Sequence, residues 1–233
     1  MNRGIYVFAL ALFAASCGDA PPADDSAEMT DNEPVTEIVD AGGSAPAGMM
    51  LRVDRSTNAD DPDNVPDVGI EMMGDGFQVT TGPAAVLWNP ENTASGAFTL
   101  SATFTLQAPS GHPNFYGLVY GGGDLDADSQ NYLYFLVAQD GNFLVKHRAN
   151  SETVHDVVAK MPHDAVATPD ASGQSVNALE VRVGAEQTEF VINGTVVHTA
   201  PKSGMAAASD GIWGVRINHQ LPGVLVEGLG TGM

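Results

Sequence analysis

The sequence predicts an all-β protein built as a two-sheet antiparallel sandwich or jelly roll. Apolar and polar residues alternate over short runs, which is the period of a strand with one buried face. Turn-forming dipeptides separate these runs, and no stretch shows sustained helical periodicity with caps. About a dozen short strands joined by tight turns are typical of such a sandwich.

The clearest strand covers residues 98–107, where Phe98, Leu100 and Phe104 share one side and hydroxyl-bearing residues take the other. Shorter strand-like runs occur at 84–88, 115–120, 132–139, 142–148, 153–158, 178–183, 188–192, 195–199, 212–218 and 224–227. The dipeptides Asp140-Gly141 and Asn193-Gly194 each stand between two such runs. Because these residue types tolerate positive φ angles, we expect a tight hairpin at each.

The N-terminus indicates export. Residues 1–16 begin with the basic Arg3, continue as an apolar run and end in small residues, as in a secretory signal peptide. The apolar run is shorter than the roughly 20 residues needed to cross a bilayer. Cys17, the only cysteine, follows directly and completes a sequence that resembles a bacterial lipobox. The resemblance implies lipidation at Cys17, with cleavage near an incidental cysteine as the alternative.

Gly18 after the cysteine resembles the pattern of lipoproteins passed on to the outer membrane. We therefore expect a cell-envelope protein, anchored by lipid and facing the periplasm or the cell surface. Acyl chains supply about 0.8 kcal/mol per buried methylene, so more than one chain gives stable anchoring.

Residues 17–48 are expected to form a disordered acidic linker after the lipidated cysteine. They are rich in Pro, Ala, Gly, Asp and Glu and lack aromatic residues. Such a composition cannot bury enough apolar surface to offset the entropy of ordering. Residues 49–233 are assigned to one β-sandwich domain, within which 58–67 reads as a loop by its Pro, Asp and Asn content.

The charge balance makes two kinds of partner poor candidates. The chain carries 29 acidic and nine basic residues, a formal net charge of −20. A field of that sign repels nucleic acid and anionic lipid headgroups. Solubility in a salty envelope accounts for the acidity, and an acidic recognition surface is the alternative.

From Phe77 onward the order of motifs resembles the concanavalin A-like lectin/glucanase superfamily, close to laminin-G-like domains and to the 3-keto-disaccharide hydrolase domain. The segments that carry the resemblance are 81–88, 98–107, 116–122, 131–137 with the hairpin 140–148, 177–183, 190–194 and 210–219. The resemblance implies two bent sheets, one with a concave face that often handles sugars. It is weak for activity, because the superfamily includes lectins, hydrolases and adhesion modules.

The scarce cations and nearby tyrosines form the main candidate site. Several lie on one side of strand-like runs, where rings and planar hydrogen-bond donors could share a sugar-binding face. The predicted ligand-binding residues are Tyr132, Tyr134, Lys146, Arg148, Arg216 and Asn218. Cross-strand salt bridges and core tyrosines are the alternative explanation.

A second candidate is a calcium site at Asp124, Asp126 and Asp128, whose alternate spacing offers hard oxygen ligands. A plain acidic turn is the alternative. The six histidines show no zinc-ligand spacing. The Glu-x-Asp-x-x-Glu and Glu-x-Asp-x-Glu patterns of laminarinase-like members do not occur, so no catalytic residue is assigned.

These observations favour a non-catalytic module that binds a glycan or envelope polymer. A glycoside or 3-keto-glycoside hydrolase is the first alternative, with acid and base groups from Asp124, Asp126, His147 and His219. A protein-interaction or structural lipoprotein is the second, and it predicts an exposed apolar patch.

Overall fold

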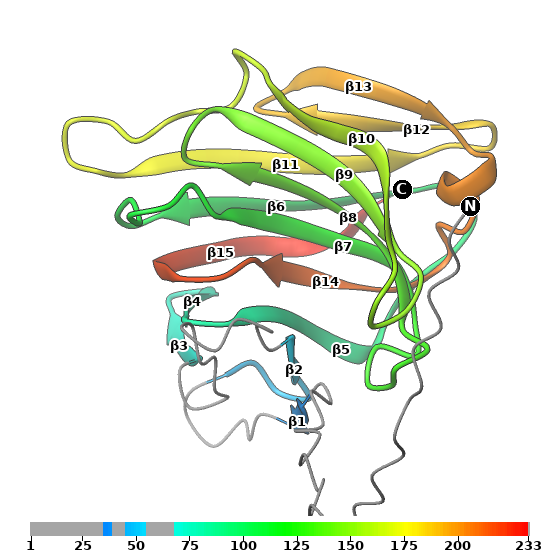
Figure 1. Ribbon diagram of the computed structural model, residues 1–233, viewed down its shortest axis with the longest axis horizontal. Coiled ribbons are helices and arrows are strands. Elements are labelled where there is room, and N and C mark those ends of the chain that lie inside the picture. Colours follow the sequence, from blue (N-terminus) through cyan, green and yellow to red (C-terminus); the bar gives the residue numbers. More distant parts are fainter. Residues whose placement is uncertain (1–34, 39–44, 55–67, 233) are drawn as a thin grey trace, which may run out of the picture. The chain divides into compact units, whose positions relative to one another are not determined.

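Two antiparallel sheets packed face to face make up the structure, a computed structural model that describes residues 35–38, 45–54 and 68–232. Figure 1 shows strands of both sheets running in roughly the same direction, with one sheet behind the other. Within these ranges the only helical segment is the 3₁₀ helix η2 (Gly204–Ala206). No helix among the described residues is long and apolar enough to cross a membrane.

The first sheet has eight strands, and neighbouring strands are hydrogen-bonded. Their order across the sheet is β1 (Val35–Ile38), β2 (Met50–Asp54), β5 (Ala84–Ala94), β14 (Gly211–Ile217), β7 (Phe115–Gly123), β8 (Asn131–Ala138), β9 (Asn142–Arg148) and β10 (Val154–Pro162). The run from β7 to β10 is a meander, in which each strand pairs with the next along the chain.

The second sheet has seven strands and includes the C-terminal strand at its centre. The order is β13 (Thr195–Pro201), β12 (Gln187–Ile192), β11 (Ser175–Val183), β6 (Phe98–Leu106), β15 (Leu221–Gly232), β4 (Gly76–Thr81) and β3 (Gly69–Met73). Because β14 and β15 are consecutive in the chain but lie in different sheets, the polypeptide crosses between layers as in a jelly roll.

The main core lies between the sheets and follows from the period-two pattern of the strands. In β6 buried and half-buried positions alternate through all nine residues, as the sequence predicts. Phe104 packs on Tyr116 of β7, and Phe135 of β8 packs on Phe190 of β12, with ring centroids 5.8 and 5.2 Å apart. Aromatic contacts between the layers therefore help to join the two sheets.

Both predicted hairpins are confirmed. Asn193 and Gly194 have φ angles of 50° and 80° and join β12 to β13 as a two-residue turn. Gly141 has a φ of 81° and closes the turn between β8 and β9, where its N–H donates to the carbonyl of Ala138.

The N-terminal strands differ from the sequence expectation. β1 falls within residues 17–48, where the sequence predicts no strand, and it pairs with β2 at the edge of the first sheet. The sequence analysis also predicts no strand over β2, β3 or β4. They are short, and β3 is exposed except at Ile70, so local periodicity carries little signal there. The predicted signal peptide, Cys17 and the whole of the loop 58–67 lie outside the described residues.

Candidate functional site

A second apolar cluster covers the side of the eight-stranded sheet that faces away from the core. Its members come from β5, β7, β8, β9 and the β7–β8 connection: Val86, Trp88, Val119, Leu125, Tyr132, Tyr134, Leu136 and Leu144. On β8, Leu133 and Phe135 point into the core between the sheets, so Tyr132 and Tyr134 must point the other way. We call this side the outer face.

The connection between β7 and β8, residues 124–130, folds back across the outer face. Leu125 in this connection is 2% exposed and belongs to the outer apolar cluster. Arg52 of β2 donates to the carbonyls of Leu125 and Ala127, at 3.3 and 2.8 Å. Strands β5 and β14 stand between β2 and β7, a separation of about 14 Å at the usual strand spacing. An arginine side chain spans only part of that distance, so the connection must approach β2.

Three arginines surround one carboxylate on this face. Arg216 Nη1 lies 2.8 Å from Asp54 Oδ2, and Arg52 Nε lies 3.1 Å from Oδ1. Arg148 Nη2 is 3.8 Å from Oδ2. Burial alone would raise the pKa of Asp54, but the charges of Arg216, Arg148 and Arg52 outweigh it and hold the pKa below its ordinary value. Asp54 is therefore ionised and ties β2 to β14 and β9.

The guanidinium of Arg216 also fixes the two tyrosines. Its Nη1 donates to the Tyr132 hydroxyl at 2.7 Å, and its Nε donates to Asn218 Oδ1 at 2.7 Å. Its carbon Cζ lies 5.3 Å from the ring centroid of Tyr134. Burial raises the pKa of Tyr132 to about 12, so this hydroxyl stays protonated. Arg216 and Tyr132 are both buried, so they support the side chains of the outer face from beneath its surface.

The accessible part of the outer face lies along β9 and β10. Lys146 and Asp156 pair across the two strands at 3.1 Å, with side chains that are 30% and 54% exposed. Arg148 Nη1 donates to the carbonyl of Ser151 at 2.8 Å. Its buried Nε has no hydrogen-bond partner among the described residues. We call Lys146, Arg148, Val154 and Asp156 the β9–β10 rim.

The structure brings the six predicted ligand-binding residues to one face. The register places Tyr132 opposite Arg148 and Tyr134 opposite Lys146. Burial divides them, however, because Tyr132, Tyr134 and Arg216 lie under other atoms while Lys146 and Arg148 remain partly accessible. For the buried three, the structure therefore favours a supporting role over direct contact with a ligand.

Arg52 and Asp54 belong to the same cluster, and sequence analysis did not single them out. Their signal was weak but present, since they alternate with Leu51 and Val53, both of which are buried in the core. That alternation covers only five residues before the loop begins, which is too short to distinguish a strand from chance.

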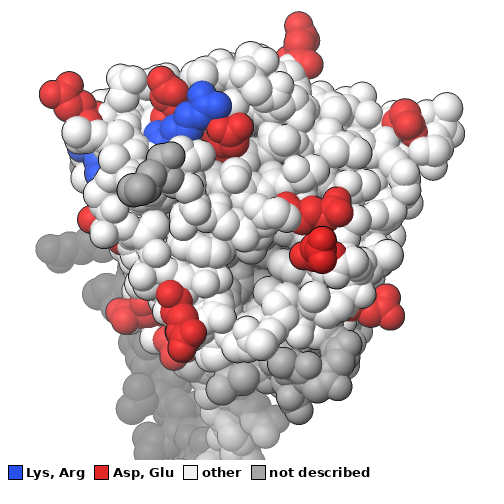
Figure 2. Space-filling view, turned by 180° about the vertical axis from the view of Figure 1, so that it is seen from behind, with Lys and Arg blue, Asp and Glu red and all other residues white. Residues whose placement is uncertain are grey.

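The distribution of positive charge sets the outer face apart. Seven Lys and Arg residues lie in the described ranges. Five of them are on this face: Arg52, Lys146, Arg148, Arg216 and also Lys160, whose Nζ lies over the ring of Phe115 beside the outer apolar cluster. Seen from behind, the molecule shows dispersed acidic side chains and few basic ones (Figure 2). In a protein with a net charge of −20, such a gathering of cations gives this face a local field unlike its surroundings.

The predicted calcium ligands do not converge. Asp124 accepts a hydrogen bond from Ser129 at 3.1 Å, and Asp128 accepts one from Ser151 at 2.7 Å. Within the described ranges, no group of three or more Asp, Glu, His or Cys residues is arranged to hold a metal ion. The arrangement of 124–130 is that of an acidic connection fastened to β2 and to the β9–β10 connection.

The four residues considered for a hydrolase also lie apart. His147 is on the opposite side of β9 from Lys146, stacks on His155 and contacts Asn131 at 3.1 Å. His219 follows β14 beside the start of β7, whereas Asp124 and Asp126 follow the end of β7. Because β7 spans nine residues, about 30 Å of strand separates His219 from those acids.

Comparison with solved structures places the fold. A carbohydrate-binding module, CBM66 from Bacillus subtilis, is similar with a TM-score of 0.54 and 13% identity over 71% of this chain and 92% of that one. A protein of unknown function with a galectin-like fold from the same organism gives 0.52 and 13% over 71% and 86%. The Bacteroides ovatus mixed linkage glucan GH16 protein, in complex with its G4G4G3G product, gives 0.52 and 8% over 82% and 97%.

No protein-family model matches the sequence, and no curated protein matches it. At these identities the structural likeness establishes architecture and leaves activity open. The order of the strands and the similarity to these three proteins lead to one conclusion. The chain has the concanavalin A-like jelly-roll fold.

Proposed function

We propose that this protein is a non-catalytic glycan-binding module, and that the ligand binds on the outer face of the eight-stranded sheet at the β9–β10 rim. The rim offers an ammonium, a guanidinium and a carboxylate from two paired strands. Sugar hydroxyls both donate and accept hydrogen bonds, so a surface with donors and acceptors at fixed spacing suits them.

The observation that carries the proposal is that the Arg148 side chain is held in place by the protein and is still partly exposed. Its Nη1 is held by the carbonyl of Ser151, while its Nε has no partner among the described residues. Because Nε itself is buried, a ligand acceptor would meet the guanidinium at the part of the side chain that is exposed, 13% in all, and a charged hydrogen bond there would stabilise the complex. Asp54 and Tyr132 support this side chain from beneath, so it is pre-organised for binding.

Similarity of fold supports the proposal. CBM66 is named as a carbohydrate-binding module, and the Bacteroides ovatus GH16 structure contains a glucan product. The absence of laminarinase-type acid patterns from the sequence favours binding over hydrolysis. The dispersed positions of Asp124, Asp126, His147 and His219 agree with that choice.

The proposal includes anchoring in the cell envelope through lipid on Cys17, most simply at the outer membrane. The expected test is a Cys17→Ala variant, which should move from the membrane fraction to the soluble fraction. It should also lose the mass of the acyl groups in intact-protein mass spectrometry. Retention of the variant in the membrane at the wild-type level would overturn this part.

Glycan binding is tested with the full chain on an array of neutral and acidic oligosaccharides. Lys146→Ala and Arg148→Ala should each weaken binding to the best glycan at least about tenfold, as expected when a charged hydrogen bond is lost. Arg182→Ala is the matched control, because Arg182 is 41% exposed and pairs with Glu180 on the seven-stranded sheet. No bound glycan, or equal losses in all three variants, would contradict the proposal.

A further inference from the structure

Positive charge exceeds negative charge in the buried part of the outer face. Asp54 is the carboxylate shared by three guanidiniums, those of Arg52, Arg148 and Arg216, whose side chains are 1%, 13% and 5% exposed. Arg52 Nη2 also lies 4.0 Å from Asp128, but that acid is 58% exposed and therefore well hydrated. Charges that are removed from water are costly unless they are paired. The cluster is therefore short of negative charge.

Arg148 is bound less closely to the shared carboxylate than the other two arginines are. Its Nη2 lies 3.8 Å from Asp54 Oδ2, which is beyond hydrogen-bond distance. Arg216 and Arg52 donate to Asp54 at 2.8 and 3.1 Å. The Nη1 of Arg148 donates to the backbone carbonyl of Ser151, which carries no full charge. An anion at the exposed part of Arg148 would supply the charge that the cluster lacks.

The side chains around Arg148 suit a sugar that carries such an anion. Val154 of β10 lies opposite Arg148 and is 38% exposed, so it offers an apolar contact for the C–H groups of a ring. Lys146 lies two residues away on the same side of β9, about 7 Å along the strand, and is 30% exposed. The β9–β10 rim thus combines two accessible cations with an apolar contact.

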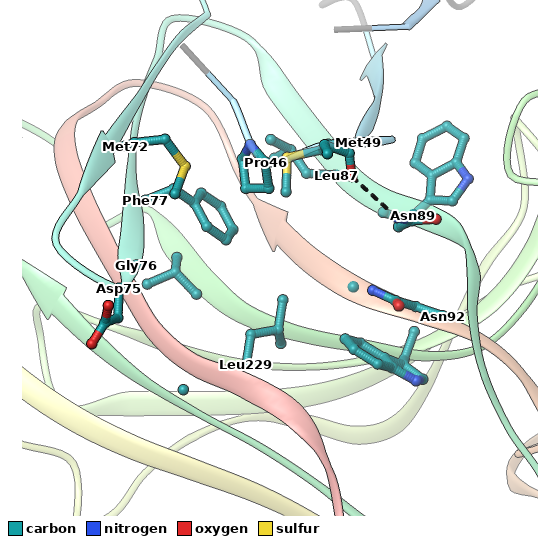
Figure 3. Close-up of a pocket in the computed structure, with 16 residues that line it drawn as sticks. Pro46, Met49, Met72, Asp75, Gly76, Phe77, Leu87, Asn89, Asn92 and Leu229 are labelled. Atoms are coloured by element: carbon teal, nitrogen blue, oxygen red, sulfur yellow. Dashed lines mark hydrogen bonds between the residues drawn. The ribbon is translucent and has the colours of Figure 1, made fainter. Parts of the chain in front are cut away.

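Two cavities elsewhere in the described part of the chain offer an anion less. One, of about 300 Å³, lies between the sheets, and apolar side chains such as Phe77 and Leu229 line it (Figure 3). The charged residue among its described lining is Asp75, which would repel an anion. The other cavity, beside β6, β11 and β12, is lined by Arg182, which is already paired with Glu180 at 2.7 Å.

The net charge of −20 does not oppose an anionic ligand at this place. At physiological ionic strength the screening length is about 8 Å, so exposed acids far from the rim act weakly there. The nearby acid is Asp156, which is 54% exposed and pairs with Lys146 at 3.1 Å. The charges closest to the ligand therefore decide the sign of the interaction.

We propose that the ligand of the β9–β10 rim is an acidic glycan, whose carboxylate or sulfate group pairs with the exposed part of the Arg148 guanidinium. This inference rests on the proposed function, because it names the class of glycan that binds at the same rim. A neutral glycan would hydrogen-bond to Arg148 but would leave the buried positive charge uncompensated.

The test uses the full chain and an array of chemically matched pairs. Oligogalacturonates are paired with their carboxyl-reduced forms, and sulfated carrageenan oligosaccharides with their desulfated forms. The same treatment is applied to any other glycan that binds best. The tightest ligand should be acidic, and its neutral counterpart should bind at least about tenfold more weakly. The two kinds of pair show whether the rim selects a carboxylate or a sulfate.

Three variants connect this preference to Arg148. In Arg148→Gln the ratio of acidic to neutral affinity should fall about fivefold, because a neutral donor replaces a charged one. In Asp156→Asn the ratio should rise about threefold, since a repelling charge several ångströms away is removed. Arg182→Gln, on the other sheet, should leave the ratio unchanged. A purely structural role of Arg148 would weaken both members of a pair alike.

The failure of this inference can be told from the failure of glycan binding itself. A tightest ligand that is neutral, or an unchanged ratio in Arg148→Gln, would overturn the acidic class and leave a glycan-binding module. If Arg148→Gln does not fold, the exposed Asp156→Asn decides, and an unchanged or lower ratio in that variant would also overturn the inference. Absence of any bound glycan would contradict the proposed function and this inference with it.

Discussion

Asp54 is the residue on which the outer face depends most. It is the carboxylate shared by Arg52, Arg148 and Arg216, and its side chain is only 16% exposed. Burying several like charges without a counter-ion is strongly unfavourable. Asp54 of β2 is therefore the acid that all three arginines share, and Asp128 also lies 4.0 Å from Arg52 Nη2.

Replacing Asp54 by Asn keeps the shape and removes the charge. We expect the free energy of unfolding to fall by about 3 kcal/mol, the usual cost of breaking a buried ion pair. Urea denaturation measures it. Asp210→Asn is the control, since that carboxylate is 58% exposed and lies 3.9 Å from Lys202, so its loss should cost little. Similar losses in both variants would refute this role.

Wild type and Asp54→Asn should also differ in how their stability depends on pH. The pKa of Asp54 is held below 3.8 in the folded protein, so its contribution to stability is complete well above pH 3.8. As pH falls through the lowered pKa, the carboxyl takes up a proton and the contribution is lost. The difference in stability between wild type and Asp54→Asn should therefore shrink below about pH 4. A difference that stays constant down to pH 3 would argue against an ionised Asp54.

His147 is expected to make the protein sensitive to mild acid. Burial, together with the neighbouring His155, lowers the pKa of His147, so the folded state prefers the neutral ring. The unfolded chain binds the proton more readily, and stability should decline as pH falls below about 6.5. Between pH 7.5 and 5.5 the melting temperature of His147→Gln should fall by less than that of the wild type. Equal losses in differential scanning fluorimetry would contradict this.

At the scale of elements, the β7–β8 connection acts as a cover for the apolar outer cluster. Leu125 packs into that cluster from the connection, whereas Leu144 packs into it from strand β9. Arg52 fastens the connection through two backbone carbonyls. The cover should therefore detach when its anchor is lost, without unfolding of the sheet beneath.

Leu125→Ala and Leu144→Ala form a matched pair for this idea. Each removes the same atoms and should destabilise the protein by about 2 kcal/mol, near the lower end for buried leucines. Only Leu125→Ala should release the connection, seen as faster hydrogen exchange and proteolysis within residues 124–130. Equal exchange in the two variants would show that Leu125 does not fasten the connection.

The sequence predicts regular elements well and irregular ones poorly. β6 and the Asn193-Gly194 hairpin follow from alternation and from residues that accept positive φ. The bulges at Trp213 and Leu229 do not, because a bulge depends on the register of the partner strand. Likewise, alternation predicts which side of its own strand Tyr134 or Lys146 occupies. Only the pairing of β8 with β9 shows that the two residues are neighbours.

For the whole molecule, the dominant feature is negative charge. The net charge of −20 produces self-repulsion that favours expansion, and salt screens it. We expect the melting temperature to rise by about 3 °C or more between 10 and 150 mM NaCl. Sodium chloride is compared with an equal osmolarity of sucrose to separate screening from solute exclusion. A flat or falling melting temperature in salt would contradict this expectation.

The most direct test of glycan recognition is a chemical-shift map of the full chain, titrated with the oligosaccharide that binds best on the array. The largest changes should fall on the backbone amides of Lys146, Arg148 and Asp156 and on the Arg148 Nε–H resonance. Changes centred on β11 and β12 of the other sheet, or none at saturating ligand, would contradict the assignment of the outer face as the binding surface.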